Sequence, residues 1–386
     1  ATIGITRAHL EEDTAKLLHD SAGTTYVNFN RAGAPLVEIV TDPDFQTAAE
    51  AKKFGQELQL LLRYLNVSSA DMEKGQMRVE ANISVQPEGS FTIVNGVVKA
   101  APGVELYHKV EVKNINSFRA VEKAIQFEIQ RQSALITAGE RWPQQTRGWD
   151  DNKGETVMQR IKENAADYRY FPEPDIPPFH PITLAGEIRL PELPAACRAR
   201  LHDEYGFSYT DAEFLATDRA LTNFADQVMS ELQEWMRSVP EAKNTGLARL
   251  AGGWITSKLL GILNERSETI SDLKISAENF AELLTLISAG RVNSTNGLKM
   301  LSEMIAAGVD VDPTHLMESK GYGQKSDVAE LGVIVAEVIK SYPTQVAQFK
   351  AGKEPILQFL KGMVMKATEG SADPAVAEQI LRDQLR

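Results

Sequence analysis

The chain has 386 residues, too many for one ordinary hydrophobic core, so its length predicts two or three domains. Hydrophobic residues make up 43% of the chain and charged residues 24%, which is typical of a globular protein. No apolar run approaches the roughly 20 residues that a membrane-spanning helix needs. The 41 Lys and Arg against 53 Asp and Glu give a net charge of -12, which excludes a protein that coats nucleic acid non-specifically. Any contact with RNA must therefore be local.

Two features of the sequence bear on location. The single cysteine, Cys197, excludes an intrachain disulfide framework and a Cys-based zinc cluster, so we expect a reducing compartment, with the cytoplasm fitting best. The opening Ala1-Thr-Ile-Gly-Ile5 lacks the basic start and long apolar stretch of a signal peptide. Because the first residue is Ala, we expect position 1 to lie inside a longer gene product.

The first 171 residues mix strand and helix patterns. Thr47 and Glu50 form a capping-box pattern before a helix expected over 47–65, and a second helix is expected after Ser117. Apolar and polar residues alternate from Met77 to Gln86, which predicts a strand with one polar face. Asn95-Gly96 between two β-branched runs predicts a hairpin with a type I′ turn.

A proline-rich stretch, 172–181, ends this mixed region, because five prolines in ten residues fit neither a helix nor an inner strand. Helical periodicity follows from about 190 to 265 and again from 268 to 386. We therefore predict an α+β protein with segments 1–178, 179–267 and 268–386, the last two all helical.

Two acidic positions near the start are candidates for a cation site. Glu11 and Glu12 lie close to His9 after a strand-like start, and paired carboxylates suit a hard cation, although a solvated charged turn is the alternative. Glu38 lies within 35–40, where the β-branched neighbours predict a strand buried on both faces. A buried carboxylate must be neutral, cation-bound or paired, here with Arg31 or Arg7.

Polar side chains also line two predicted strands. Arg78, Glu80 and Asn82 share one strand face, and Lys109, Glu111 and Lys113 share another. These faces could converge on phosphate, or form the wet face of an antiparallel sheet. The chain has no Walker loop, Gly-x-Ser-x-Gly elbow, Cys-x-x-Cys or His-Glu-x-x-His motif, so we do not expect nucleophilic catalysis.

Several blocks together resemble one family, the GatB subunit of the aspartyl/glutamyl-tRNA amidotransferase, over essentially the whole chain. The blocks lie, in the family's order, at 3–13, 30–44, 77–84, 111–119, 145–147 and in Asp167-Tyr-Arg-Tyr-Phe-Pro-Glu-Pro-Asp175. The end of the chain, with 342–343, 349–353 and 362–368, is similar to the family's YqeY-type tail.

This resemblance implies a kinase-like cradle domain, then a helical domain and a YqeY-like tail. The cradle would use ATP and Mg²⁺ to phosphorylate the side-chain carboxylate of Glu-tRNA(Gln) or Asp-tRNA(Asn), and ammonia would displace the phosphate. Ammonia would come from the family's A subunit, which is a glutaminase, and the small C subunit would complete a heterotrimer. The location would be the bacterial cytoplasm, or the mitochondrial matrix in a eukaryote.

The resemblance also assigns residues. It implies catalytic roles for four acids and cation binding for three residues that overlap them. The polar strand faces predict nucleotide binding by four polar residues, and four lysines of the tail suit the tRNA docking that the resemblance implies. The catalytic acids are Glu11, Glu12, Glu38 and Glu80, and the cation-binding residues are Glu12, Glu38 and His9. The nucleotide-binding residues are Arg78, Asn82, Lys113 and Asn114. The tRNA-binding lysines are Lys350, Lys353, Lys361 and Lys366.

Two departures from the family pattern stand out. The family's opening block, a strand with a Glu and a His of the kinase site, lies before residue 1, and Val79 and Glu80 stand where the family usually has Cys and Asp. The first departure leaves a non-catalytic tRNA-binding scaffold as an alternative. The motifs alone, without the resemblance, also allow a free-standing carboxylate-amine ligase acting on small molecules.

Overall fold

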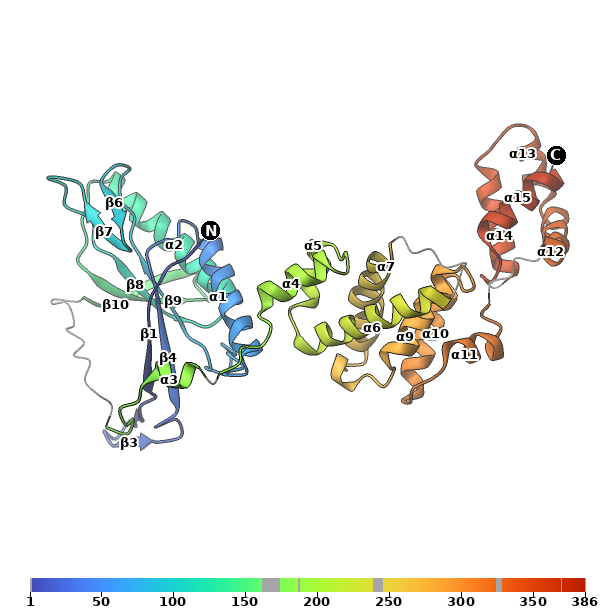
Figure 1. The fold of residues 1–386 in the computed structure, drawn as a ribbon. Helices are drawn as coiled ribbons and strands as arrows, with labels where there is room; N and C mark the ends of the chain where they lie inside the picture. Colours follow the sequence, from blue (N-terminus) through green and yellow to red (C-terminus); the bar gives the residue numbers. More distant parts are fainter. Residues whose placement is uncertain are drawn as a thin grey trace. The chain divides into compact units, whose positions relative to one another are not determined.

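The computed structural model describes residues 2–161, 174–186, 188–238, 246–323, 328–368 and 370–385. The chain folds as two compact units, Ala1–Pro191 and Glu192–Arg386 (Figure 1). The first unit combines strands with helices and the second is built of helices, which confirms the predicted α+β class. The finer division of the chain at 178 and 267 stays a prediction.

The main sheet of the first unit has four strands in the order β10-β9-β8-β5. It is mixed, because β8 and β9 run parallel while the other neighbours run antiparallel. Three further antiparallel pairs, β1 with β4, β2 with β3 and β6 with β7, are separate two-stranded sheets. The bounds are β1 Ile5–Glu12, β2 Lys16–His19, β3 Thr25–Asn28, β4 Pro35–Thr41, β5 Val79–Ile83, β6 Phe91–Val94, β7 Val97–Ala100, β8 Val110–Ile115, β9 Gln145–Asp150 and β10 Glu155–Ile161.

Of two long helices, the second along the chain covers one face of the main sheet, and the first packs on it. The first, α1 (Ala48–Tyr64), begins at the predicted capping box, in which Thr47 Oγ1 accepts from the Glu50 N–H at 3.2 Å. The second, α2 (Phe118–Thr137), is capped by Ser117 and supplies the crossover that parallel strands β8 and β9 require. It packs on β5, β8 and β10, and α1 packs on it (Figure 1).

The core of the first unit lies between α2 and the sheet. Val110, Val112 and Ile115 of β8 meet the apolar face of α2, and the two tryptophans of the unit, Trp142 and Trp149, close the same cluster. The apolar face of the sheet is thereby buried. The opposite face is left to carry polar side chains.

The predicted hairpin at Asn95-Gly96 is confirmed. Asn95 and Gly96 have φ of 51° and 71°, as a type I′ turn between β6 and β7 requires. Gly96 is needed for a second reason, because a Cβ there would lie 2.7 Å from the Asp42 carboxylate. The turn thus rests against the end of β4.

The second unit begins with helices that bury Phe224 of α6 against Phe280 of α9, with ring centroids 5.5 Å apart. A separate apolar cluster, including Leu331, Leu360 and Leu381, forms the core of residues 328–385. No helix in the described ranges is both long and apolar enough to cross a membrane. After the short α3 (Pro181–Ala185) of the first unit, the helices are α4 Pro194–Asp203, α5 Tyr209–Leu215, α6 Arg219–Ser238, α7 Leu247–Gly253, the π-helical turn Trp254–Leu259, α8 Leu260–Glu265, the 3-10 turn Ile270–Asp272, α9 Ala277–Ser288, α10 Ser294–Ala307, α11 Pro313–Lys320, α12 Val328–Ser341, α13 Pro343–Lys350, α14 Ile356–Ala367 and α15 Pro374–Leu385.

Candidate functional site

The acids near the start of the chain lie on the antiparallel pair β1–β4. His9 pairs directly with Glu38, Glu11 with Leu36, and Glu12 with Pro35. Because side chains alternate along a strand, His9, Glu11 and Glu38 share one face of the pair, here called the ladder face. Glu12 projects from the other face. The structure therefore brings His9 and Glu38 together but separates Glu12 from both.

One alternative and one expectation about these acids were wrong. The alternative of a charged turn is excluded, because Glu11 and Glu12 lie inside a strand. Glu38 does not lie in a strand buried on both faces, since its side chain is 42% exposed and Val37 beside it is 47% exposed. The physical reason is that, among the described strands, β4 pairs with β1 alone, in a two-stranded sheet outside the main core.

The charge of Glu38 is balanced by an ion pair. Arg7 Nη2 lies 3.3 Å from Glu38 Oε2, so of the two arginines considered from the sequence, Arg7 is the partner. Arg31 instead pairs with Asp13 at 2.7 Å and donates to the carbonyl of Gly75 at 3.0 Å. Arg31 thus ties the end of the β1–β4 pair to the loop that leads into β5.

A second polar group lies on the open face of the main sheet. Lys113 Nζ lies 3.0 Å from Glu80 Oε1 on the neighbouring strand and 3.7 Å from Glu111 Oε1 on its own strand. The Thr146 hydroxyl on β9 donates to Glu111 Oε2 at 2.8 Å. Glu80, Glu111, Lys113 and Thr146, here called the sheet cluster, therefore join three strands.

The remaining nucleotide-binding candidates surround this cluster. Asn82 is exposed and pairs with Glu111 across the strands, and Arg78 is exposed just before β5. Asn114 has a φ of 61°, a left-handed conformation that asparagine adopts more readily than most residues. A Cβ at Gly148 would lie 3.1 Å from Asn114 Nδ2 and closer still to Gln159 Nε2, so glycine leaves room for both amides.

The structure tests how well the ladder face fits a cation. Within the ranges that the structure describes, no group of three or more His, Cys, Asp or Glu lies close enough together to hold a metal ion. Glu11 and Glu38 nevertheless offer two carboxylates on one face. This fits Mg²⁺, which is usually held by one or two carboxylates, with water and substrate phosphates filling the other positions.

Sequence reasoning missed a buried charged network behind the sheet. The fully buried Glu128 of α2 forms a bidentate pair with Arg131 at 2.9 Å and lies 3.1 Å from Arg147 Nε. Thr156 and Gln132 also donate to its carboxylate. Burial alone would raise the pKa of Glu128, but the hydrogen bonds from Arg131, Thr156 and Gln132 outweigh it and hold this pKa below its usual range.

The sequence did carry a signal for this network. Glu128 and Gln132 continue the apolar stripe of Val121 and Ile125 at spacings of three and four residues. A carboxylate on the buried stripe of a helix must find partners. Arg147, in the block 145–147, is one of them.

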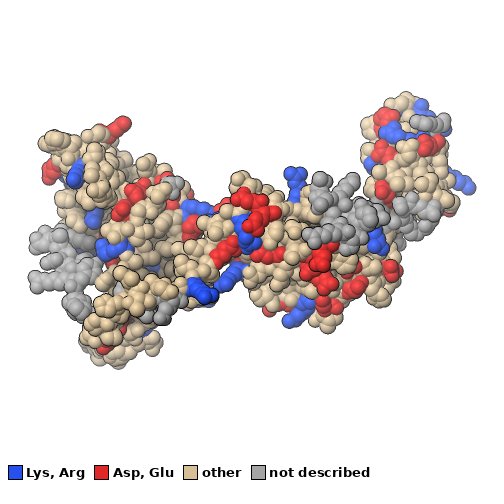
Figure 2. Space-filling model, in the orientation of Figure 1, with Lys and Arg blue, Asp and Glu red and all other residues tan. Residues whose placement is uncertain are grey.

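The lysines proposed for tRNA binding differ in their surroundings. Lys350, Lys353 and Lys366 are exposed, whereas Lys361 is paired with Glu378 at 2.8 Å. On the face drawn in Figure 2, Lys and Arg are scattered in small groups. The lysines of α13 and α14 are therefore local sites of positive charge.

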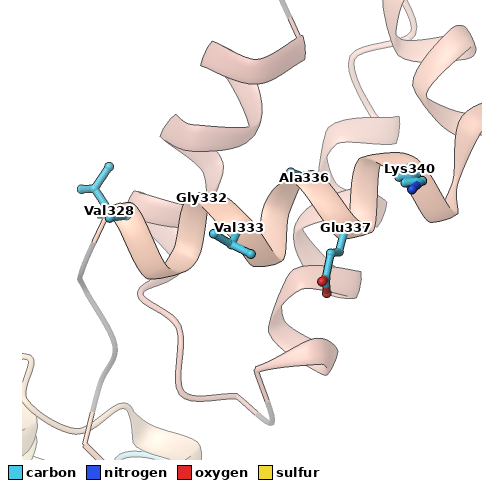
Figure 3. Close-up of a pocket in the computed structure, with 7 residues that line it drawn as sticks. Val328, Gly332, Val333, Ala336, Glu337 and Lys340 are labelled. Carbon is cyan, nitrogen blue, oxygen red and sulfur yellow. The ribbon is translucent and has the colours of Figure 1, made fainter.

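One surface depression lies on α12, with a volume of about 470 Å³. It is lined mainly by small and apolar side chains such as Val328, Gly332 and Val333, and Figure 3 shows the labelled residues spaced along a single helix. Its lining includes one acid, Glu337, and so offers no paired carboxylates for a cation. The block Asp167–Asp175 lies outside the described residues except for Pro174 and Asp175.

Comparison with known proteins bears on both units. The family model of the GatB/GatE catalytic domain matches residues 1–184, and that of the GatB domain matches residues 237–385. Proteins named as the B subunit of aspartyl/glutamyl-tRNA(Asn/Gln) amidotransferase are similar to nearly the whole chain. That of Dehalococcoides mccartyi is 40% identical over an alignment of 393 positions, gaps included, that covers 99% of this chain and 76% of the relative. That of Thermosynechococcus vestitus is 39% identical over 392 aligned positions, which cover 99% of this chain and 73% of the relative. The chain therefore belongs to the GatB family, the B subunits of aspartyl/glutamyl-tRNA amidotransferases.

Proposed function

We propose that the chain acts as the B subunit of a glutamine-hydrolysing, tRNA-dependent amidotransferase, a ligase of protein biosynthesis that converts Glu-tRNA(Gln) or Asp-tRNA(Asn) to its amide. The observation that carries this proposal is the match of the family's catalytic-domain model to residues 1–184, which include both polar groups described above. The relatives' names add the substrate class.

The chemistry requires activation of a carboxylate, which is a poor electrophile at neutral pH. A side-chain oxygen of the aminoacyl group attacks the γ-phosphorus of ATP, and ADP leaves with the bond electrons. Ammonia then attacks the acyl carbon, the carbon–oxygen bond to phosphate breaks, and amide and inorganic phosphate result. Catalysis of such a transfer consists mainly of positioning and neutralising charge.

We assign Mg²⁺ to the ladder face of a kinase-like cradle formed by the first unit. Glu38 and Glu11, the two carboxylates on this face, would hold the ion, which would neutralise the charge of the phosphates, and His9 lies beside Glu38 on the paired strand. Arg7 holds the Glu38 carboxylate on this face through their ion pair. Glu12 projects from the opposite face, so its catalytic role is a separate proposal with its own variant, Glu12→Gln.

The nucleotide would lie on the open face of the main sheet. Lys113 offers an ammonium group to phosphate, and exposed Arg78, Asn82 and Asn114 offer further donors around it. Glu80 pairs with Lys113 and would orient the ammonium group. These roles rest on the residue types and on the arrangement of Lys113 between two carboxylates.

We propose the partners that the family resemblance implies. The glutaminase, which is the A subunit, would supply ammonia, and the small C subunit would complete the heterotrimer, in the bacterial cytoplasm or a mitochondrial matrix. Residues 268–386 would bind tRNA through Lys350, Lys353 and Lys366, and through Lys361 where phosphate displaces Glu378. No membrane partner is proposed.

The test is Glu38→Gln in the assembled complex, read as ADP formation that depends on Glu-tRNA(Gln). Loss of a cation ligand should lower kcat by about 10²-fold or more while tRNA affinity stays unchanged. Arg7→Gln is the matched control, because it breaks the same 3.3 Å ion pair but keeps the carboxylate. It should lower kcat only a few-fold, since an exposed pair is worth under about 1 kcal/mol.

Four results would overturn parts of this proposal. Full activity of Glu38→Gln would remove Glu38 from the cation site. Equal losses in Glu38→Gln and Arg7→Gln would make the ion pair, and not the carboxylate, the essential feature. Absence of ATP turnover in the wild-type complex would favour the scaffold, and turnover without tRNA would favour a small-molecule ligase.

A further inference from the structure

We infer that Thr146 is a positioning residue of the proposed site, acting through Glu111 to fix the ammonium group of Lys113. This inference deepens the proposed function and rests on it for its catalytic consequence. Its structural part concerns only the residues of the sheet cluster. Thr146 lies on β9, one strand beyond Lys113, and is 1% exposed.

The two oxygens of Glu111 have different partners. Oε2 accepts the hydrogen bond from the Thr146 hydroxyl at 2.8 Å, and Oε1 faces Lys113 Nζ at 3.7 Å. Because a carboxylate is planar, a bond that fixes one oxygen also fixes the direction of the other. The Glu111 side chain is only 14% exposed, so water has limited access to replace the threonine.

This carboxylate in turn restricts Lys113. The ammonium group lies between Glu111 of its own strand and Glu80 of β5, to which it donates at 3.0 Å. A lysine side chain is a flexible four-carbon stem and holds one orientation only when its head is fixed. Thr146 thus limits the freedom of Lys113 without contacting it.

The register of the strands holds the threonine in place. β8 and β9 run parallel with Glu111 beside Thr146 and Lys113 beside Gly148. The threonine is therefore held by main-chain pairing next to the carboxylate it orients, and glycine adds no side chain beside the lysine. A hydroxyl on a paired strand is a more rigid donor than one on a loop.

Without the hydroxyl, Glu111 Oε2 loses the hydrogen bond from Thr146 in a largely buried position. The carboxylate would rotate to take a hydrogen bond from water, and the ammonium group would no longer be held between Glu111 and Glu80. We expect Thr146→Val to lower kcat roughly 10- to 100-fold, the usual range for an outer residue that orients a site group. Thr146→Ser keeps the donor and should stay within about threefold of the wild type.

The experiment measures both position and activity in the complete complex. The rate of acetylation of Lys113 under trace labelling, read by mass spectrometry, should rise roughly threefold in Thr146→Val, as expected when an ammonium loses an ion pair worth under about 1 kcal/mol. It should be unchanged in Thr146→Ser and in the matched control Thr92→Val, an exposed strand threonine of β6. Lys350 serves as the internal reference.

A double-mutant cycle tests the route through Glu111. If Thr146 acts through that carboxylate, Thr146→Val should have little further effect on labelling or kcat in a Glu111→Gln background. Full additivity would overturn the inference, as would unchanged Lys113 labelling in Thr146→Val. The labelling result does not depend on the reaction. If Lys113 labelling changes as expected but no variant, nor the wild type, shows tRNA-dependent turnover, the proposed function is wrong and the positioning role of Thr146 still holds.

Discussion

The buried network around Glu128 gives the sharpest test of how the first unit is held together. Glu128→Gln removes the charge but keeps the shape, and leaves Arg131 and Arg147 without the carboxylate that they share. Breaking one partner of a buried ion pair costs about 3–5 kcal/mol, because the remaining charges stay desolvated. A loss of this size is a large fraction of the free energy of unfolding of an ordinary domain.

Hydrogen exchange read by mass spectrometry reports on this unit alone. Peptides that cover β8 and β9 should exchange roughly 10²- to 10⁴-fold faster in Glu128→Gln, if their amides open by unfolding of the unit. Glu122→Gln is the control on the same helix, since Glu122 forms a half-exposed pair with Lys52 at 2.7 Å. Its effect should stay within about fivefold, the equivalent of roughly 1 kcal/mol.

The pH dependence of this difference has a definite sign. Because the network lowers the pKa of Glu128 in the folded protein, its contribution is fully present above the ordinary carboxyl pKa of 4.5. It is lost as the pH falls through the lowered pKa of the folded state. Wild type and Glu128→Gln should therefore converge in acid. Equal effects of Glu128→Gln and Glu122→Gln at neutral pH would refute the reasoning.

Two further predictions concern the second unit. Burial raises the pKa of Glu282 on α9, so the free energy of unfolding should fall as the pH rises from 4.5 through that raised pKa. The variant Glu282→Gln should therefore have a higher melting temperature than the wild type at neutral pH. The control Glu278→Gln, at an exposed position of the same helix, should not. For tRNA binding, we expect a change to Gln at Lys350, Lys353 or Lys366 to reduce the slope of log affinity against log salt concentration by somewhat under about one unit. The control Lys340→Gln, at an exposed lysine of α12, should leave this slope unchanged. Equal slopes in all four variants would contradict the assignment.

Local signals in the sequence predicted the elements that depend on local physics. The capping box at Thr47, the helix that starts after Ser117 and the turn at Asn95-Gly96 each depend on residues within a few positions of one another, and all three were confirmed. The exposure of Glu38 was predicted wrongly, because a run of β-branched residues does not reveal how many strands and helices cover it.

The sheet cluster could be predicted only in part. Alternation placed Glu80 and Lys113 on polar strand faces, but it could not give the order of the strands, which is what brings Thr146 to Glu111. A single threonine or glycine on β9 does not produce a periodic pattern of apolar and polar residues in the sequence. Their roles follow from the parallel register of β8 and β9, which pairs residues 35 positions apart in the chain.

The two faces of β9 connect the stability of the unit to the proposed site. Thr146 and Arg147 are neighbours and so point to opposite faces of the sheet. Arg147 donates to the hydroxyl and to the carbonyl of Thr156, at 2.7 and 2.6 Å, and lies beside Glu128. These bonds fix β9 against β10 and α2, and with it the place from which Thr146 reaches Glu111. A network of buried charges is costly to desolvate, and apolar residues of similar volume would often serve stability as well. The Glu128 network instead contributes directional hydrogen bonds, which hold β9 at a set position. Thr146 is thereby held within hydrogen-bonding distance of Glu111, the carboxylate that orients Lys113.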